Sequence, residues 1–223
     1  MLWRHSLTRF FSLHAAASTI LLFTASRTSN HVHGFPHHSY RSLCRFSSSR
    51  RKAPGSQFPL KMTPNYFLIK SEPDAFSIQD LRDCPDSQDE WDGVRNYQAR
   101  NILRKMKKGD FAFFYHSSCK VPAIVGQAVV VREAAPDLTA LDPNEKYYDP
   151  KSTTDNCRWD SVRFQLDEIY KESITLKELK SLKESDDIIA GMSLFRNSRL
   201  SVQEVTEEQW DRIKEIQKIK KTT

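Results

Sequence analysis

The sequence predicts an α+β domain, built as a curled mixed sheet or an open barrel with short helices at its sides. Runs of aromatic and β-branched residues indicate short strands, and apolar residues at helical spacing indicate short helices between them. The two kinds of segment alternate irregularly, which is typical of an α+β arrangement. Hydrophobic residues make up 39% and charged residues 28% of the 223 residues, a composition that supports a real core.

Strands are expected where apolar residues form short runs or alternate with polar ones. The run YFLI follows Pro64, and the runs FAFFY and IVGQAVVV follow Gly109. The expected strands are Tyr66–Ile69, Phe111–Tyr115, Ile124–Val131, a segment in which Val162, Phe164 and Leu166 alternate, and a late one with Leu200, Val202 and Val205.

Helices are expected where a capping residue precedes apolar residues at helical spacing. Ser77 and Asp80 form a capping box before a short helix over Ile78–Leu81, and Thr206 and Gln209 form another before a final helix. One helix is expected to bury Ala99, Ile102, Leu103 and Met106, to have Lys107 and Lys108 in its last turn and to end at Gly109. A later helix is expected to bury Leu176, Leu179 and Leu182. The final helix is expected to bury Trp210, Ile213 and Ile216.

Residues 1–61 differ in composition from the rest of the chain. They hold nine of the 34 basic and none of the 28 acidic residues, which leaves the remainder a net charge of −3. A basic, serine-rich segment with the apolar stretch Leu13–Ala25 is typical of a presequence. We therefore expect a disordered targeting leader and linker over 1–61, for a mitochondrion or plastid, and a folded domain over 62–223. Translation from Met62 would give a leaderless protein of the cytosol or nucleus.

The residues that usually hold metals and cofactors are sparse in the folded part. The four cysteines are widely spaced, six of the seven histidines precede residue 62, and the chain has only six glycines. We expect no metal, no cofactor and no membrane contact for the mature domain, and we take it as a monomer. His116, Ser117 and Cys119 leave an enzyme open, in which His116 or Cys119 is required for turnover. Isolated His and Ser residues are more often polar scaffold.

Aromatic residues interleaved with Arg and Asn occur in Trp91–Arg100 and in Lys151–Arg163, and Arg196 to Ser201 add a third polar cluster. Rings can stack on an unpaired base, amides can pair with its edge, and cations can hold phosphates. Trp91 and Trp159 are equally compatible with a role as core anchors, because Trp is highly buried on average. Both interpretations stay open at this point.

The stretches YFLIKSEPDAFSIQDL, WDGVRNYQARNILRKMKKGDFAFFYHS and DPNEKYYDPKS resemble the EVE domain family, of the thymocyte nuclear protein type. The resemblance covers about Asn65 to Ile219. It implies a PUA-like fold and a non-catalytic module that accepts a modified cytosine of DNA, in the 5-methyl or 5-hydroxymethyl form, in an aromatic pocket. The alternative is a module that binds RNA or a modified ribonucleotide, which an organellar leader would favour.

The resemblance also assigns residues to the site. The base-binding pocket is expected to include Lys70, Ser71, Trp91, Val94, Arg95, Asn96, Tyr97, Tyr115, His116, Ser117, Arg158, Trp159, Arg199, Leu200 and Ser201. Phosphate contacts are expected from Arg100, Lys151 and Arg196. Val94 is expected to sense a methyl group, and replacement of Trp91 or Trp159 by Ala to weaken binding while the fold stays intact. Because the body is nearly neutral, binding is expected to be weak and salt-sensitive.

Overall fold

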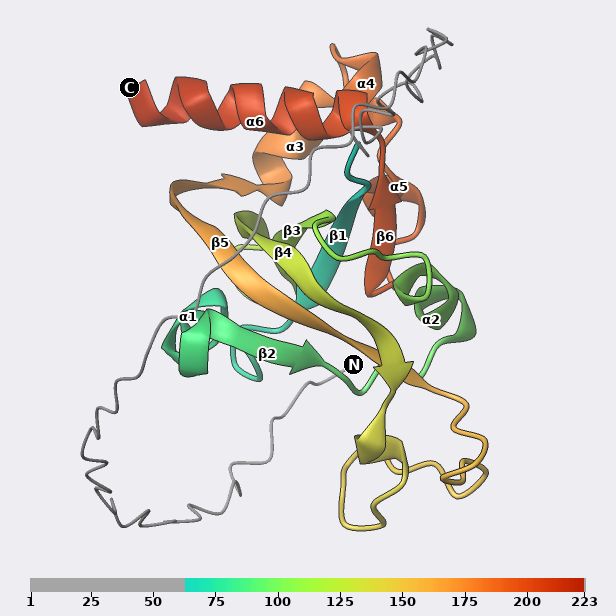
Figure 1. The fold of residues 1–223 in the computed structure, drawn as a ribbon. Coiled ribbons are helices and arrows are strands. Elements are labelled where there is room, and N and C mark those ends of the chain that lie inside the picture. The colour runs from blue at the N-terminus through green and yellow to red at the C-terminus, as the bar shows by residue number, and fades with distance from the viewer. Residues whose placement is uncertain (1–62, 223) are drawn as a thin grey trace, which may run out of the picture. The chain divides into compact units, whose positions relative to one another are not determined.

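The computed structural model describes residues 63–222, so the leader predicted over 1–61 lies outside the described residues and stays a prediction. Within this part, strands form one mixed sheet in the order β2-β5-β4-β3-β1-β6 (Figure 1). The strands are β1 (Tyr66–Ser71), β2 (Gln88–Trp91), β3 (Phe111–His116), β4 (Ala123–Pro136), β5 (Asp160–Thr175) and β6 (Val202–Val205). The helices are α1 (Ile78–Asp83), α2 (Tyr97–Leu103), α3 (Leu176–Leu182), α4 (Asp187–Ala190), α5 (Ser193–Arg196) and α6 (Glu207–Thr222).

The strand pairing makes the sheet mixed. β1 runs parallel to β3, and the other neighbouring strands of the sheet are antiparallel. In the parallel pair Lys70 lies opposite Tyr115, and Ser71 lies opposite His116. Partners in register point to the same face of a sheet. The sheet therefore brings together residues that are 45 positions apart in the sequence.

The two faces of the sheet carry different hydrophobic clusters. Along β1, Phe67 and Ile69 belong to a cluster that includes residues of α1 and α2 and of all six strands. Leu68 belongs to a second cluster with residues of α3, α4, α5 and α6. Figure 1 shows α3 and α6 on one side of the sheet and α1 on the other. Because Lys70 has the same parity as Leu68, its side chain lies on the α3–α6 side.

The contact between β2 and β3 shows that the sheet curls. In a flat sheet these strands would stand about 14 Å apart, because β5 and β4 lie between them. The rings of Trp91 on β2 and Phe114 on β3 nevertheless meet edge to face, with centroids 5.5 Å apart. The predicted curled mixed sheet with short flanking helices is therefore confirmed.

Local capping holds the helices where the sequence predicts them. The Ser77 hydroxyl accepts the Asp80 N–H, and the Asp80 carboxylate accepts the Ser77 N–H, which completes the predicted capping box of α1. The Gln209 N–H donates to the Thr206 hydroxyl, and the Thr206 N–H donates to the Gln209 side chain, so α6 begins as expected. The predicted strands also form, although β1, β3 and β4 run further than expected.

The expected end of α2 was wrong. The helix stops at Leu103, and Lys107 and Lys108 lie in the turn that leads to β3 rather than in a last helical turn. The reason is local: the Asp110 carboxylate accepts the N–H of Lys107 at 2.8 Å and that of Asn65 at 2.8 Å, so it fixes the turn instead. Met106 is fully buried as predicted, but from outside the helix.

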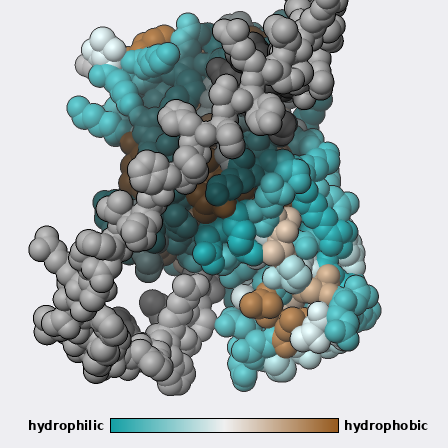
Figure 2. Space-filling view, in the orientation of Figure 1, coloured by the Kyte–Doolittle hydropathy of each residue, from teal (hydrophilic) through white to brown (hydrophobic). Residues whose placement is uncertain are grey.

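Several elements carried no clear sequence signal. β2 has the polar sequence QDEW and pairs with β5 at the edge of the sheet. The single-turn helices α4 and α5 were also not predicted, and Leu200 precedes β6 instead of belonging to it. On the face seen in Figure 2 the coloured atoms are mainly hydrophilic, with hydrophobic residues on the lobe between β4 and β5 and others nearer the centre of the molecule. No helix among residues 63–222 is long and apolar enough to cross a membrane.

Candidate nucleic-acid interface

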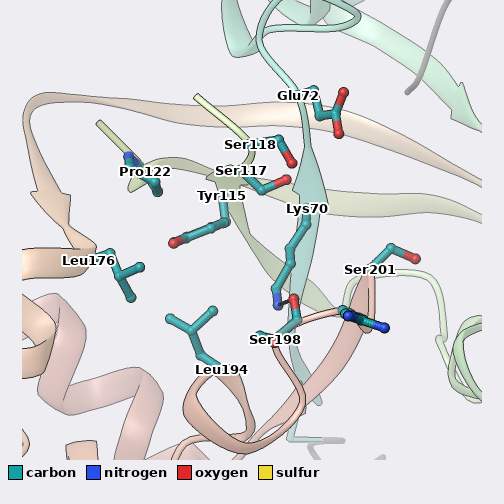
Figure 3. A pocket seen from close by; sticks show the side chains of 11 residues that line it. Lys70, Glu72, Tyr115, Ser117, Ser118, Pro122, Leu176, Leu194, Ser198 and Ser201 are labelled. Atoms are coloured by element: carbon teal, nitrogen blue, oxygen red, sulfur yellow. Dashed lines mark hydrogen bonds between the residues drawn. The ribbon is translucent and has the colours of Figure 1, made fainter. Parts of the chain in front are cut away.

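A cavity of about 480 Å³ lies at the ends of β1 and β3, on the α3–α6 side of the sheet (Figure 3). Its wall combines the ends of these strands with the segments that follow β3 and α5. We call it the base cavity. It is lined by Lys70, Glu72, Tyr115, Ser117, Ser118, Pro122, Leu176, Leu194, Ser198, Arg199 and Ser201.

Lys70 is the most unusual residue of the base cavity. Its side chain is 6% exposed, yet its ammonium makes no ion pair within the described residues. Nζ donates one hydrogen bond, to the Ser198 carbonyl oxygen at 3.0 Å, and lies 6.0 Å from the centre of the Tyr115 ring. Burial lowers the pKa of Lys70 to about 8, because water no longer solvates the charge. The amine therefore has donor capacity left for a ligand in the cavity.

Besides Lys70, the base cavity is lined by the charged residues Glu72 and Arg199 and by neutral hydroxyl groups. Burial raises the pKa of Tyr115 to about 12, so its phenol keeps its proton at neutral pH. The Ser117 N–H donates to the Ser71 carbonyl oxygen at 2.7 Å, which joins the segment after β3 to the end of β1. Figure 3 shows Lys70 reaching toward Ser198, with Tyr115, Leu176 and Leu194 on its other side. One side of the cavity is thus apolar.

Three residues that were expected in the pocket do not line the cavity and instead make contacts within the fold. The Ser71 hydroxyl donates to the Phe76 carbonyl oxygen at 2.7 Å, and Leu200 belongs to the core. His116 Nε2 accepts the N–H of Ile78, the first residue of α1, at 3.2 Å. Burial lowers the pKa of His116, so the ring is neutral and acts as an acceptor.

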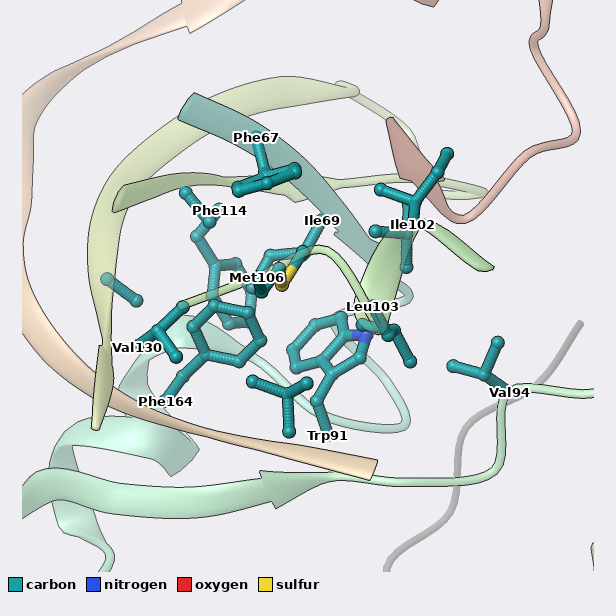
Figure 4. Close-up of a cluster of buried hydrophobic side chains, with 14 of the residues drawn as sticks. Phe67, Ile69, Trp91, Val94, Ile102, Leu103, Met106, Phe114, Val130 and Phe164 are labelled. Carbon is teal, nitrogen blue, oxygen red and sulfur yellow. The ribbon is translucent and has the colours of Figure 1, made fainter. Parts of the chain in front are cut away.

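Trp91 and Val94 lie in the core, which corrects their expected place in the wall of a pocket. Trp91 is 2% exposed and meets the rings of Phe76, Phe114 and Phe164 edge to face (Figure 4). Val94 is also buried and belongs to the same cluster, so it offers no open niche for a methyl group. Of the two interpretations of Trp91, the structure supports the core anchor.

The remaining predicted residues form a second region, the aromatic–arginine face, made of Arg95, Tyr97, Arg100, Arg158 and Trp159. The Tyr97 and Trp159 rings stack with their centroids 4.8 Å apart. The Arg100 guanidinium lies 4.8 Å from the centre of the Tyr97 ring, and that of Arg158 lies 5.6 Å from it. Trp159 is itself buried, so its ring is held within the fold.

The polar atoms of this face already have partners within the fold. Arg95 pairs with Asp137 at 2.6 Å and donates to the Tyr147 carbonyl oxygen at 2.7 Å. The Trp159 indole N–H donates to Asp149, which also pairs with Arg158 at 3.3 Å. The further contacts are Arg100 with the Arg158 carbonyl oxygen, Arg158 with the Tyr97 hydroxyl, and Asn96, whose side chain caps α2 through the Ala99 N–H. Most polar groups of this segment thus have partners within the fold, while the Tyr97 side chain is 48% exposed.

Tyr147 packs against the segment that precedes α2. Its pKa is raised by burial first and then by the negative charges of Asp92 and Glu72, and Glu72 lines the cavity. Gly93 has a φ of +68°, and a Cβ there would lie 2.7 Å from the Tyr147 ring, so only glycine fits. Burial, with the charge of Asp137, raises the pKa of Asp92 to about 7. Gly93 and Arg95 therefore both contact Tyr147.

A match to a known family decides the identity of the fold. The EVE domain model matches residues 65–216. The chain belongs to the EVE domain family. Thymocyte nuclear protein 1 of Homo sapiens is 43% identical over 177 residues, which cover 74% of this chain and 79% of that protein. The Rattus norvegicus protein of the same name is 46% identical over 164 residues, covering 68% and 73%. The resemblance seen in the sequence is confirmed.

Solved structures share the fold of this EVE domain. The crystal structure of human THYN1 in complex with DNA containing 5-methylcytosine matches with a TM-score of 0.67 at 43% identity, covering 69% of this chain and 97% of that one. A hypothetical protein from Leishmania major matches with a TM-score of 0.66 at 41% identity, covering 71% and 98%. The PUA-like fold expected from the sequence is confirmed.

Sequence reasoning about this EVE domain missed much of the cavity wall. Six lining residues were not predicted: Glu72, Ser118, Pro122, Leu176, Leu194 and Ser198. Glu72, Ser118 and Ser198 carried a signal, since each lies next to a predicted residue. Lys151 and Arg196, expected at phosphates, are exposed and make no ion pair within the described residues, and neither lines the base cavity. Residues 63–222 contain no group of His, Cys, Asp and Glu that could hold a metal ion.

Proposed function

We propose that this EVE domain binds DNA that contains a modified cytosine and accepts the extruded base in the base cavity. The observation that carries the proposal is the match to human THYN1, which was crystallised in complex with DNA containing 5-methylcytosine and is 43% identical to this chain. The cavity volume of about 480 Å³ falls within the usual range of small-ligand sites.

The chemistry of the cavity suits a cytosine. The base has two acceptors on its pairing edge, O2 and N3, and the Lys70 ammonium is a donor with unused capacity. Its exocyclic amino group needs an acceptor, which the hydroxyls of Ser117 and Ser201 can supply. Such contacts offset the few kcal/mol that it costs to take a base out of the stack.

The apolar side of the cavity is the proposed place for the 5-methyl group. Leu176, Leu194 and Pro122 line it, and they replace Val94, which is buried in the core. Burial of one methyl group contributes roughly 0.8 kcal/mol, which corresponds to about a four-fold preference. A hydroxymethyl group in the same place would need a polar partner as well.

A binding assay with matched duplexes tests the function. Fluorescence anisotropy of the full-length chain at fixed salt would compare duplexes with unmodified, 5-methyl or 5-hydroxymethyl cytosine, and RNA of the same sequence. We expect the 5-methyl duplex to bind at least about four-fold tighter than the unmodified one. Equal affinity for all DNA duplexes would overturn the proposal, and a preference for RNA would place the function in the RNA-binding class.

We also propose that the module is not an enzyme. His116 is engaged as a neutral acceptor for the N–H of Ile78, which leaves its Nε2 lone pair occupied. A base with this geometry has no vacant nitrogen at Nε2 to take a proton from a nucleophile. Mass spectrometry of a 5-methylcytosine oligonucleotide after prolonged incubation with the protein should show no change in mass. A new product that disappears in the H116Q variant would contradict this.

We propose that the protein exists in two forms, which start at different methionines and reach different compartments. The chain that starts at Met62 would act in the nucleus, which is consistent with the names of the thymocyte nuclear protein relatives. The full chain would follow the leader predicted over residues 1–61 to an organelle. Imaging of C-terminal fluorescent fusions, with Met1 or Met62 as the only start, tests this. Identical distribution of both fusions would remove the role of the leader.

A further inference from the structure

A second cavity of about 400 Å³ adjoins the base cavity at α3. The two cavities share Pro122 and Leu176 as wall residues. They therefore lie on either side of an apolar saddle formed by these two side chains. The second cavity is lined by Pro122, Leu176, Lys177, Lys180, Ser181 and Glu184. The base cavity with Lys70 and the second cavity with the exposed side of α3 therefore adjoin at Pro122 and Leu176.

The outer cavity presents two lysines with unused charge. Lys177 and Lys180 are exposed and are one helical turn apart, so they lie on the same side of α3. Neither makes an ion pair within residues 63–222, and the one carboxylate in the cavity wall is Glu184. Glu178 of the same helix is engaged elsewhere, because it accepts from Thr175 and pairs with Lys220.

Two arginines near the interface have carboxylate partners already. On the aromatic–arginine face, Arg95 pairs with Asp137 and Arg158 pairs with Asp149. A phosphate there would compete with a carboxylate that is already in place. A phosphate in the outer cavity meets two lysines and displaces no ion pair of theirs. Charge complementarity therefore favours α3 over the aromatic–arginine face as the path of a polyanion.

We propose that the outer cavity holds the phosphodiester backbone next to the bound base, with Lys177 and Lys180 as its contacts. The assignment rests on the proposed function, because the occupant is the strand that delivers the base to the base cavity. The saddle of Pro122 and Leu176 then separates base from backbone and contacts the apolar face of the sugar. Phosphate contacts carry no sequence information, so the outer cavity adds affinity for every DNA and no preference for the modification.

The salt dependence of binding tests this assignment. Each lysine that contacts a phosphate adds roughly 1 to the slope of log affinity against log salt concentration. The full-length K177Q/K180Q variant should lower this slope by about 2 and weaken modified and unmodified duplexes by the same factor. The matched control is K171Q/K218Q, which removes two exposed lysines of β5 and α6 that make no ion pair within the described residues. It should leave the slope unchanged.

The outcomes separate the two proposals. The proposed function depends on the ratio of affinities for modified and unmodified DNA, whereas the backbone path depends on the slope. An unchanged slope in K177Q/K180Q, or an equal fall in the control, overturns the path even if the ratio stays above one. If wild type binds modified and unmodified DNA with equal affinity, the base preference is overturned. The slope of log affinity against log salt concentration then still tests the backbone path. A wild-type chain that binds no DNA overturns both.

Discussion

The base cavity and the aromatic–arginine face differ in what their polar groups already do. In the cavity, Lys70 is buried with one hydrogen bond and no carboxylate partner among the described residues. On the face, Arg95 and Arg158 pair with carboxylates, and the rings of Tyr97 and Trp159 cover each other. The cavity holds a cation with no carboxylate partner among the described residues, whereas these two arginines of the face already have theirs. Substitutions in the two regions should therefore change different measurements.

The comparison shows how a dense motif can mislead. WDGVRNYQAR holds aromatic, amide and guanidinium groups within ten residues, the set that recognition of a base requires. The same groups also bind one another, and here Trp91 packs in the core while Asn96 caps α2. Unused donor capacity is a property of the packed structure, and residue types alone do not reveal it.

The largest effect is expected from W159A on the face. The ring is buried, stacks on Tyr97 and donates its N–H to Asp149 at 2.8 Å. Its removal should lower the free energy of unfolding by about 3–5 kcal/mol, and W91A should do the same. Urea unfolding followed by circular dichroism measures both. If W159A unfolds at the wild-type midpoint but no longer binds DNA, the face is a binding site and the comparison fails.

K70M should have the opposite effect. The variant keeps most of the side-chain volume but removes a buried charge, so the free energy of unfolding should not fall. A charge-assisted hydrogen bond to the base contributes about 1.5–3 kcal/mol, so affinity for modified DNA should fall roughly 10- to 100-fold. K171M, at an exposed site on β5, is the matched control. Loss of stability without loss of affinity in K70M would assign Lys70 to the fold.

The pH dependence of stability and of DNA affinity tests the same role of Lys70. Folding lowers the pKa of Lys70 from 10.5 to about 8, so the unfolded chain binds the extra proton between these values. This residue's contribution to stability therefore rises as the pH increases from about 8 to 10.5, and affinity for DNA falls over the same range as the donor is lost. Comparison of wild type with K70M isolates both trends. Affinity that stays constant up to pH 10 in the wild type would exclude the ammonium as a donor.

The smallest effect is expected from R100Q. Arg100 lies over the Tyr97 ring and donates to the Arg158 carbonyl oxygen, but it makes no ion pair within residues 63–222. Its loss should cost about 0.5–1 kcal/mol of stability. The salt slope should stay within about 0.3 of the wild type, because the proposed backbone path runs over α3. A slope lowered by a full unit would move the phosphates to the face.

Local signals predicted most of the fold. The capping pairs Ser77 with Asp80 and Thr206 with Gln209 form as expected, because both partners lie within one helical turn. β2 was not predictable in the same way, since its sequence QDEW is polar and it becomes a strand only by pairing with β5. Lys107 and Lys108 were misplaced because Asp110 stabilises a turn that competes with the helix.

The base cavity was only partly predictable. Five residues that the family resemblance assigns to a base pocket line it, and their contact with a base stays a prediction: Lys70, Tyr115, Ser117, Arg199 and Ser201. Its apolar wall comes from side chains such as Leu176 and Leu194, which reach the site from α3 and α5 through the packing of these helices on the sheet. No local sequence pattern predicts that these leucines line the cavity, because the same residues fit an ordinary buried helix face equally well.

The most direct measurement follows Leu methyl groups and Trp indole N–H signals by NMR as a 5-methylcytosine duplex is added. The ring current of a base in the cavity should shift the methyl signals of Leu176 and Leu194, which line it. The indole N–H of Trp159, bonded to Asp149, should stay in place. Shifts at Leu176 and Leu194 without a shift at Trp159 are the predicted result. A shifted Trp159 signal with both leucines unchanged would contradict the account and place the base on the aromatic–arginine face.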